Sequence, residues 1–121
     1  MSRHFFDTVS EGRPVRVTIG YDRPTDSFFM LIEARPGPDT YIGRWPYLYA
    51  SAADLEDRPD DLAYYQTKLA ARRIAIPPGL LGAVEADAAD RIGNYAVEHF
   101  ADGSIHEHFP RPLAPRPYSR R

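Results

Sequence analysis

The chain has 121 residues, of which 43% are hydrophobic and 26% are charged, and it contains no cysteine. This composition is typical of one soluble globular domain. The absence of cysteine excludes a disulfide scaffold, a thiolate metal site and a cysteine nucleophile. The longest apolar run, residues 28–32, is far shorter than the roughly 20 residues of a membrane span. The N-terminus lacks the apolar stretch of a signal peptide, so we expect a cytoplasmic protein without membrane association.

Charge is distributed unevenly along the chain. The formal net charge is −2, but residues 110–121 contain four arginines and no acidic residue, so residues 1–109 carry −6. Four prolines also fall within residues 110–117, and such a segment neither pairs in a sheet nor continues a helix. We therefore expect one folded domain over residues 1–109 and a flexible Pro/Arg-rich tail over residues 110–121.

The first third of the chain predicts three β-strands. Residues 4–9 come first, and in the second run, residues 15–21, apolar and polar residues alternate with a period of two. That period is typical of a strand with one buried face. Residues 27–33 follow a turn and are apolar on both faces, which favours a central strand covered on both sides. The short turns between the three runs predict an antiparallel meander.

The segment over residues 35–50 is rich in aromatic residues and broken by proline and glycine. A short strand over residues 40–44 is expected, followed by irregular chain, because Pro46 argues against a long strand there. Large aromatic side chains with polar tips anchor many protein interfaces. The segment therefore either covers one end of the core or forms a partner-binding surface, and the residues concerned are Tyr41, Trp45, Tyr47 and Tyr49.

Two helices are predicted in the middle of the chain. The first follows the acids at residues 60 and 61, which favour the positive end of a helix dipole, and its apolar stripe is Leu62, Tyr65, Leu69 and Ile74. The second follows the two prolines at residues 77 and 78 and ends at residues 93 and 94. Its expected apolar stripe is Leu80, Leu81, Val84 and Ala88.

The last folded segment is a predicted hairpin over residues 95–109. Together these elements predict an α+β fold: an antiparallel β-meander, then two helices, then a C-terminal hairpin, in one sheet with both helices on one face. We expect that sheet to be antiparallel throughout. A sheet of this size leaves an edge strand that a second copy of the chain could cover, so a homodimer is one expectation.

The hairpin register decides whether three histidines could form a metal site. If Asp102 and Gly103 form a two-residue turn, His99, His106 and His108 share one face, as three-histidine zinc sites require. If Gly103 instead forms a bulge, His99 lies on one face and the other two histidines lie opposite, beside Glu98. We favour the bulged register because it gathers the apolar residues on one face and avoids a Glu–Glu pair. We therefore predict no native metal site.

Other signals of catalysis are weak. The glycines form no phosphate-binding loop, and the serines lack a nucleophile-elbow context. Acidic residues crowd the segment before the first helix, at Asp54, Glu56, Asp57, Asp60 and Asp61. They are either a paired-carboxylate site or, as we favour, helix-capping and solvated residues.

The chain resembles a family of small uncharacterised bacterial proteins, often encoded on plasmids and integrated mobile elements. The resemblance rests on Gly12-Arg13-Pro14-Val15, on Gly20-Tyr21-Asp22-Arg23-Pro24, on Phe28-Phe29-Met30, and on Asp61-Leu62-Ala63-Tyr64-Tyr65. It extends through residues 93 and 94 to the turn at residues 102 and 103, and thus covers roughly residues 5–105. It implies no activity and no catalytic residue.

We therefore expect a non-enzymatic interaction or accessory protein of a bacterial mobile element, with another protein as its partner and with no cofactor. One alternative is weak, salt-sensitive binding of nucleic acid by the tail residues Arg111, Arg116, Arg120 and Arg121, which the acidic body opposes. The other alternative is a metal-binding protein or metalloenzyme that uses His99, His106 and His108.

Overall fold

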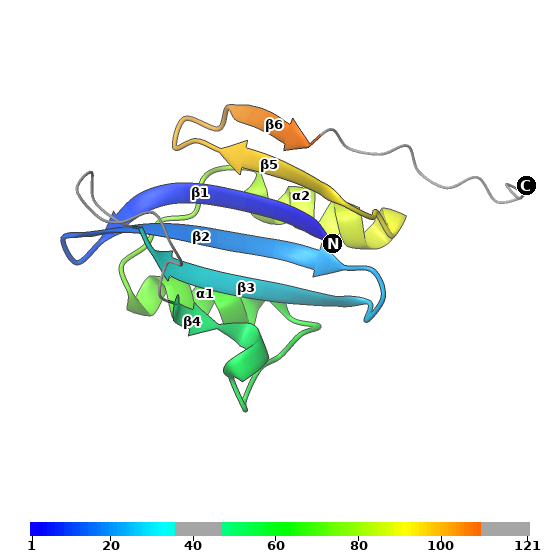
Figure 1. The fold of residues 1–121 in the computed structure, drawn as a ribbon, viewed down its shortest axis with the longest axis horizontal. Helices are drawn as coiled ribbons and strands as arrows, with labels where there is room; N and C mark the ends of the chain where they lie inside the picture. The colour runs from blue at the N-terminus through cyan, green and yellow to red at the C-terminus, as the bar shows by residue number, and fades with distance from the viewer. Residues whose placement is uncertain (36–46, 110–121) are drawn as a thin grey trace, which may run out of the picture.

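A computed structural model describes residues 1–35 and 47–109. Figure 1 shows one six-stranded sheet, in the order β4-β3-β2-β1-β5-β6, with both helices behind it in that view. This is the predicted α+β fold. The elements are β1 (Ser2–Ser10), β2 (Arg13–Asp22), β3 (Ser27–Ala34), β4 (Tyr47–Ala50), the short 3-10 helix η1 (Ser51–Ala53), α1 (Leu62–Ala71), α2 (Leu80–Asp90), β5 (Tyr95–His99) and β6 (Ile105–Phe109).

The core lies between the sheet and the two helices. The alternation predicted for β2 is confirmed, since all four of its apolar side chains on the helix-facing side are buried. Burying an aliphatic or aromatic side chain contributes about 1.5–3 kcal/mol, so this layer supplies most of the stabilisation. Its buried members are Phe6, Val15, Val17, Ile19, Met30, Ile32, Leu62, Tyr65, Leu69, Ile74, Leu80 and Val84.

The sheet is mixed, so the expectation of an antiparallel sheet throughout was wrong. β1 pairs with β2 in the antiparallel sense and with β5 in parallel, from Ser2 opposite Tyr95 to Phe5 opposite Glu98. A parallel pair needs a long crossover connection. The helices α1 and α2 lie between the meander and β5, and they carry the chain back to the end of the sheet where β1 starts.

The strands β3 and β4 also differ from expectation. β3 lies between β2 and β4, but the helices cover only one of its faces: Met30 and Ile32 are buried there, while Phe29 and Leu31 are half-buried on the other. The expected strand over residues 40–44 lies outside the described residues. The strand β4 instead occupies residues 47–50, where irregular chain was predicted, and it begins directly after Pro46.

Both helices form where they were predicted. Asp61 caps α1 by accepting a hydrogen bond from the backbone N–H of Ala63 at 3.0 Å, as the capping interpretation of the acids requires. In α2 the buried positions after Leu80 and Val84 continue to Asp87, while Ala88 is only half-buried. The buried stripe thus continues at the carboxylate of Asp87 and not at its neighbour Ala88, which had been predicted.

The hairpin adopts the bulged register that the sequence favoured. Val97 pairs with Glu107 and His99 pairs with Ile105, and Gly103 has a φ of +89° after the turn. His99 therefore points toward the helices. In the described part of the chain, neither helix is long and apolar enough to cross a membrane.

Candidate functional site

The three hairpin histidines do not converge. His99 is 4% exposed on the helix side of the sheet, whereas His106 and His108 are exposed on the opposite face. There Glu98 accepts a hydrogen bond from Nε2 of His108 at 2.9 Å, although its partner across the strands is His106. Among residues 1–35 and 47–109, no group of three His, Asp or Glu side chains is placed to hold a metal ion.

His99 instead ends a buried chain of hydrogen bonds that starts at a carboxylate of α2. Oδ2 of Asp87 lies 2.6 Å from Nε2 of His4, and Nδ1 of His4 lies 2.8 Å from Nε2 of His99. These three side chains come from α2, β1 and β5 and are each at most 4% exposed. The parallel pairing of β1 with β5 aligns the two histidines, because both project from the helix face of neighbouring strands.

The carboxylate of Asp87 has further donors. The hydroxyl of Tyr95 donates to its Oδ1 at 2.9 Å and also lies 3.3 Å from Nε2 of His4. Burial alone would raise the pKa of Asp87, but hydrogen bonds from His4, Ser2 and Tyr95 outweigh it and hold that pKa below its usual range. Asp87 is therefore ionised at neutral pH. We call Asp87, His4, His99 and Tyr95 the histidine chain.

The ionised carboxylate fixes the direction of the hydrogen bond from His4. Because Asp87 can only accept, Nε2 of His4 carries a hydrogen and donates it. When Nδ1 of His4 accepts from Nε2 of His99, Nδ1 of His99 keeps a free lone pair; when Nδ1 of His4 donates instead, Nδ1 of His99 carries the hydrogen.

The end of the chain is a buried nitrogen with no partner. Nδ1 of His99 forms no hydrogen bond to any described residue. Burial, together with the electrostatic effect of His4, lowers the pKa of His99 to about 4, so its ring is neutral at pH 7. A buried acceptor without a donor costs about 1–3 kcal/mol. Such an atom needs a partner other than the described side chains, either a water molecule or a ligand.

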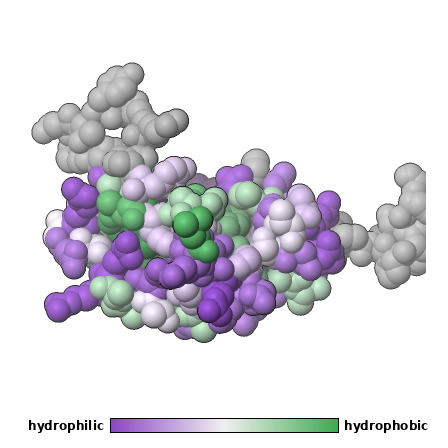
Figure 2. Space-filling view, turned by 90° about the horizontal axis from the view of Figure 1, so that it is seen from below, coloured by the Kyte–Doolittle hydropathy of each residue, from purple (hydrophilic) through white to green (hydrophobic). Residues whose placement is uncertain are grey.

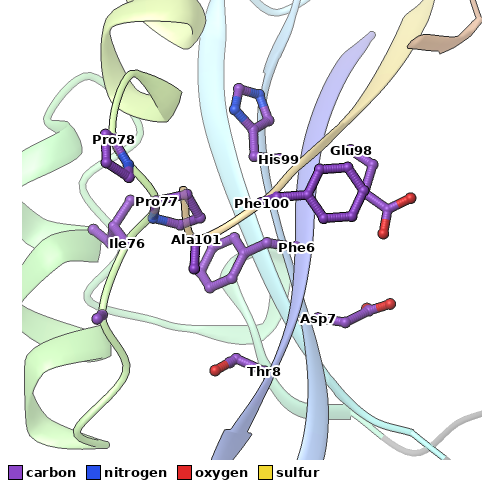
Figure 3. A pocket seen from close by; sticks show the side chains of 11 residues that line it. Phe6, Asp7, Thr8, Ile76, Pro77, Pro78, Glu98, His99, Phe100 and Ala101 are labelled. Atoms are coloured by element: carbon purple, nitrogen blue, oxygen red, sulfur yellow. The ribbon is translucent and has the colours of Figure 1, made fainter. Parts of the chain in front are cut away.

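His99 lies between two hollows in the surface. The first, which we call the His99 cavity, has a volume of about 260 Å³ and is walled by the apolar side chains of Phe6, Ile76, Pro77 and Pro78, together with Phe100. Figure 3 shows the ring of His99 at one end of this cavity. The second hollow, of about 300 Å³, lies between the start of α2 and the hairpin, and His99 and Pro78 line both.

This arrangement can accept a hydrogen bond and pass a proton along two rings toward a carboxylate. It is not a nucleophile triad, because His99 forms no hydrogen bond to a hydroxyl group anywhere in residues 1–35 and 47–109. The histidine chain thus ends at an unpartnered ring nitrogen of a residue that lines two surface hollows.

The acidic segment before α1 forms a second polar cluster, the tyrosine cluster of Asp54, Tyr49, Tyr64 and Lys68. Both tyrosine hydroxyls donate to Oδ2 of Asp54 at 2.7 Å, and Nζ of Lys68 lies 3.9 Å from the same oxygen. These hydroxyls, with the backbone N–H of Glu56, lower the pKa of Asp54 to about 2. The Asp54 carboxylate is thus occupied by structural contacts.

The proposed partner-binding aromatics separate into different environments. Tyr47 is 56% exposed on the edge strand β4, whereas Tyr49 is half-buried and bonded to Asp54. Tyr41 and Trp45 lie outside the described residues. The same holds for the four tail arginines, Arg111, Arg116, Arg120 and Arg121.

Three members of the histidine chain were not predicted as site residues. Asp87 had a local signal, since it lies seven residues after Leu80 and three after Val84, on the apolar stripe of α2. His4 had a weaker local signal, because it lies two residues before the buried Phe6 and so on the same face of the strand. Tyr95 was expected to be buried with Val97, but nothing local linked it to a carboxylate.

Comparisons with protein-family models, with curated proteins and with solved structures found no match to this chain.

Proposed function

We propose that the protein binds a small, largely apolar molecule in the His99 cavity through one hydrogen-bond donor on that molecule. The observation that carries the proposal is the buried, unpartnered Nδ1 of His99 at the end of the histidine chain. A dry cavity of about 150 Å³ can take a benzene ring. The His99 cavity has a volume of about 260 Å³, so it has room for a substituted ring or a molecule of similar size.

Binding fits the electrostatics better than catalysis does. A general base works best when its pKa is near the working pH, whereas the pKa of His99 is lowered to about 4 by burial and by His4. A neutral imidazole of this kind accepts a hydrogen bond without taking the proton. The bond from His99 to His4 and the bond from His4 to Asp87 then hold the acceptor ring in one orientation.

The proposal can be tested with phenol and anisole, which have similar shapes but differ in their hydrogen-bond donor. Titration followed by NMR of the histidine ring nitrogens should show phenol shifting the Nδ1 signal of His99. A neutral hydrogen bond contributes about 1 kcal/mol, so phenol should bind about fivefold more tightly than anisole. Ala101→Trp, which places a large ring at the rim of the cavity, should weaken both ligands.

His99→Phe keeps a ring at this position and removes the acceptor, so the preference for phenol should disappear. The matched control is His108→Phe, which changes an exposed histidine on the other face and should leave the preference unchanged. Equal binding of phenol and anisole by the unmodified protein, or a preference that survives His99→Phe, would overturn the proposal. Circular dichroism of each variant separates a lost ligand site from a lost fold.

A second function, partner binding through the aromatic segment, is favoured by the exposure of Tyr47 on an edge strand. Figure 2 shows the molecule from the β4 side, where hydrophilic residues surround small, separate hydrophobic patches. The resemblance to mobile-element proteins suggests a partner encoded on the same element. Trp45→Ala with Tyr47→Ala should abolish capture of that partner without unfolding the domain, and unchanged capture would exclude this surface.

A further inference from the structure

The face of the sheet opposite the helices carries a groove of about 350 Å³. Side chains of β1, β2, β3 and β5 that alternate away from the core line it, and we call it the open-face groove. The residues that matter for the argument are Arg3, Phe5, Phe29, Leu31, Glu33 and Ala96. Figure 1 views the sheet from this side.

The floor of the groove is aromatic. The ring of Phe29 lies so close over Gly20 that a Cβ there would come within 2.7 Å of its Cζ. The guanidinium of Arg16 lies 4.5 Å from the centre of the Phe5 ring. Flat aromatic surfaces of this kind receive proline rings in grooves that bind proline-rich segments, and they also stack against arginine.

One side of the groove carries the carboxylate of Glu33, opposite Arg16 on the neighbouring strand. Glu33 is half-buried, and it forms no hydrogen bond or ion pair with any residue in the described part of the chain. Its burial raises its pKa, an effect that the charge of Arg16 only partly offsets. Arg16 itself donates two hydrogen bonds to Asp7, at 2.7 and 3.0 Å. Glu33 thus faces Arg16 across the strands, but among the described residues it has no cation that bonds to it directly.

We propose that the chain's own residues 110–121 occupy the open-face groove, with an arginine of this tail paired to Glu33 and its prolines on Phe29. Phe5 is only 9% exposed, beneath Arg16 and His108. The tail carries +4 and the rest of the chain −6, so the charges are complementary. The tail also starts beside the groove, because Phe109 pairs with Ala96, which lines it.

The length of the tail fits this path. From β6 to β3 the chain must cross four strand spacings of about 4.8 Å and then about four residues along β3, a diagonal of about 23 Å. A proline-rich segment advances about 3.1 Å per residue. Seven residues span about 22 Å, and the long arginine side chain covers the remainder, so the seventh residue after Phe109, Arg116, is within reach of Glu33. Arg116 is the partner we assign to Glu33.

The test uses the full chain. Because this chain has no cysteine, a single introduced cysteine can carry a spin label at one known position. A nitroxide label on Leu113→Cys should broaden the amide signals of residues 3–5 and 29–33 and leave those of α1 and α2 sharp. Glu33→Gln and Arg116→Gln should each reduce this broadening by at least half. The matched control, Glu85→Gln, removes an exposed carboxylate from α2 on the other side of the sheet and should leave it unchanged.

Three results would overturn the proposal. The first is the absence of selective broadening on the open face. The second is broadening that Glu33→Gln leaves intact, since the ion pair would then play no part. The third is broadening that passes to an unlabelled copy when labelled and unlabelled chains are mixed, because the tail would then bind a second molecule. None of these results bears on the His99 cavity, which lies on the helix side.

Discussion

The histidine chain and the tyrosine cluster are both built around one aspartate, yet they differ in how they end. In the tyrosine cluster the hydroxyls of Tyr49 and Tyr64 donate directly to Asp54, and no buried side-chain nitrogen or oxygen of this cluster lacks a partner among the described residues. In the histidine chain the hydrogen bonds run from Asp87 through two imidazoles to Nδ1 of His99, which has no partner among the described residues.

Burial makes that difference matter. The side chain of Asp54 is 13% exposed, so water can reach it, whereas Asp87 and His4 are each 1% exposed. An unsatisfied polar atom is inexpensive near water and costly in the interior. The hydrogen bonds of the tyrosine cluster thus have a structural role, since they link α1 to β4. The unsatisfied end of the histidine chain leaves a position for a water molecule or for the ligand that we propose.

The largest expected loss of stability comes from removing the carboxylate of Asp87 in the histidine chain. Asp87→Ala leaves the buried donors of His4 and Tyr95 without their acceptor, which costs about 1–3 kcal/mol for each, or about 2–6 kcal/mol for both. Urea denaturation should show a fall of that size in the free energy of unfolding. Glu85→Ala, on the exposed side of the same helix, should change it by no more than about 0.5 kcal/mol. An equal loss from Asp54→Ala would remove the distinction between the clusters.

The two clusters should also lose stability in different pH ranges. The folded pKa of His99 is about 4 against 6.5 for the free side chain, so between these values the unfolded chain binds a proton that the folded chain rejects. The free energy of unfolding should therefore fall as the pH drops from 6.5 to 4, by about 3 kcal/mol in total. The contribution of Asp54, whose pKa is about 2 against 3.8, is lost only below that range.

Unfolding at a series of pH values measures both effects. His99→Phe should remove the pH dependence of the free energy of unfolding between pH 6.5 and 4. Asp54→Asn should remove the pH dependence below pH 4. If the unmodified protein and His99→Phe show the same slope between pH 6.5 and 4, His99 does not carry the effect.

Loss of a single hydroxyl gives a smaller and more direct comparison. Tyr95→Phe takes a donor from a fully buried carboxylate, which should cost about 1–2 kcal/mol. Tyr64→Phe takes one from Asp54, which keeps Tyr49 and the backbone N–H of Glu56, and should cost less than about 1 kcal/mol. Thermal and urea unfolding of the two variants should give that order, and the reverse order would contradict our account of burial.

The smallest effect is expected on the exposed face of the hairpin. His108→Ala breaks a surface pair with Glu98, and such pairs contribute about 0–1 kcal/mol. The free energy of unfolding should change by no more than about 0.5 kcal/mol. A large loss would show that the exposed histidines are as important to the fold as His99.

Most of the fold was predictable because its signals are local. The alternation in β2, the stripe of α1 and the burial preference of the hairpin each depend on residues close in sequence. The hairpin register shows this best, since it was predicted from placing Val97 and Ile105 on one buried face. Val97 is buried as expected, but Ile105 is 55% exposed, so that part of the expectation was wrong. The parallel pairing of β1 with β5 was not predictable, because it depends on where two helices return the chain.

The candidate site was predictable only in part, and for the same reason. His99 was recognised as a candidate, and the favoured register placed it correctly on the buried face. Its partners His4 and Asp87 lie on other elements, and their spacing in sequence carries no pattern. A carboxylate on the apolar stripe of α2 was the one local sign that a buried polar group needed a partner.

The position of β1 in the middle of the sheet has a consequence for synthesis of the protein. One edge of β1 pairs with β2, the next strand, but its other edge waits for β5, and His4 and His99 are 95 residues apart. A nascent chain can thus form the meander early while it still exposes an open strand edge, which is prone to mispairing. The ligand site is completed in the same late step that closes this edge.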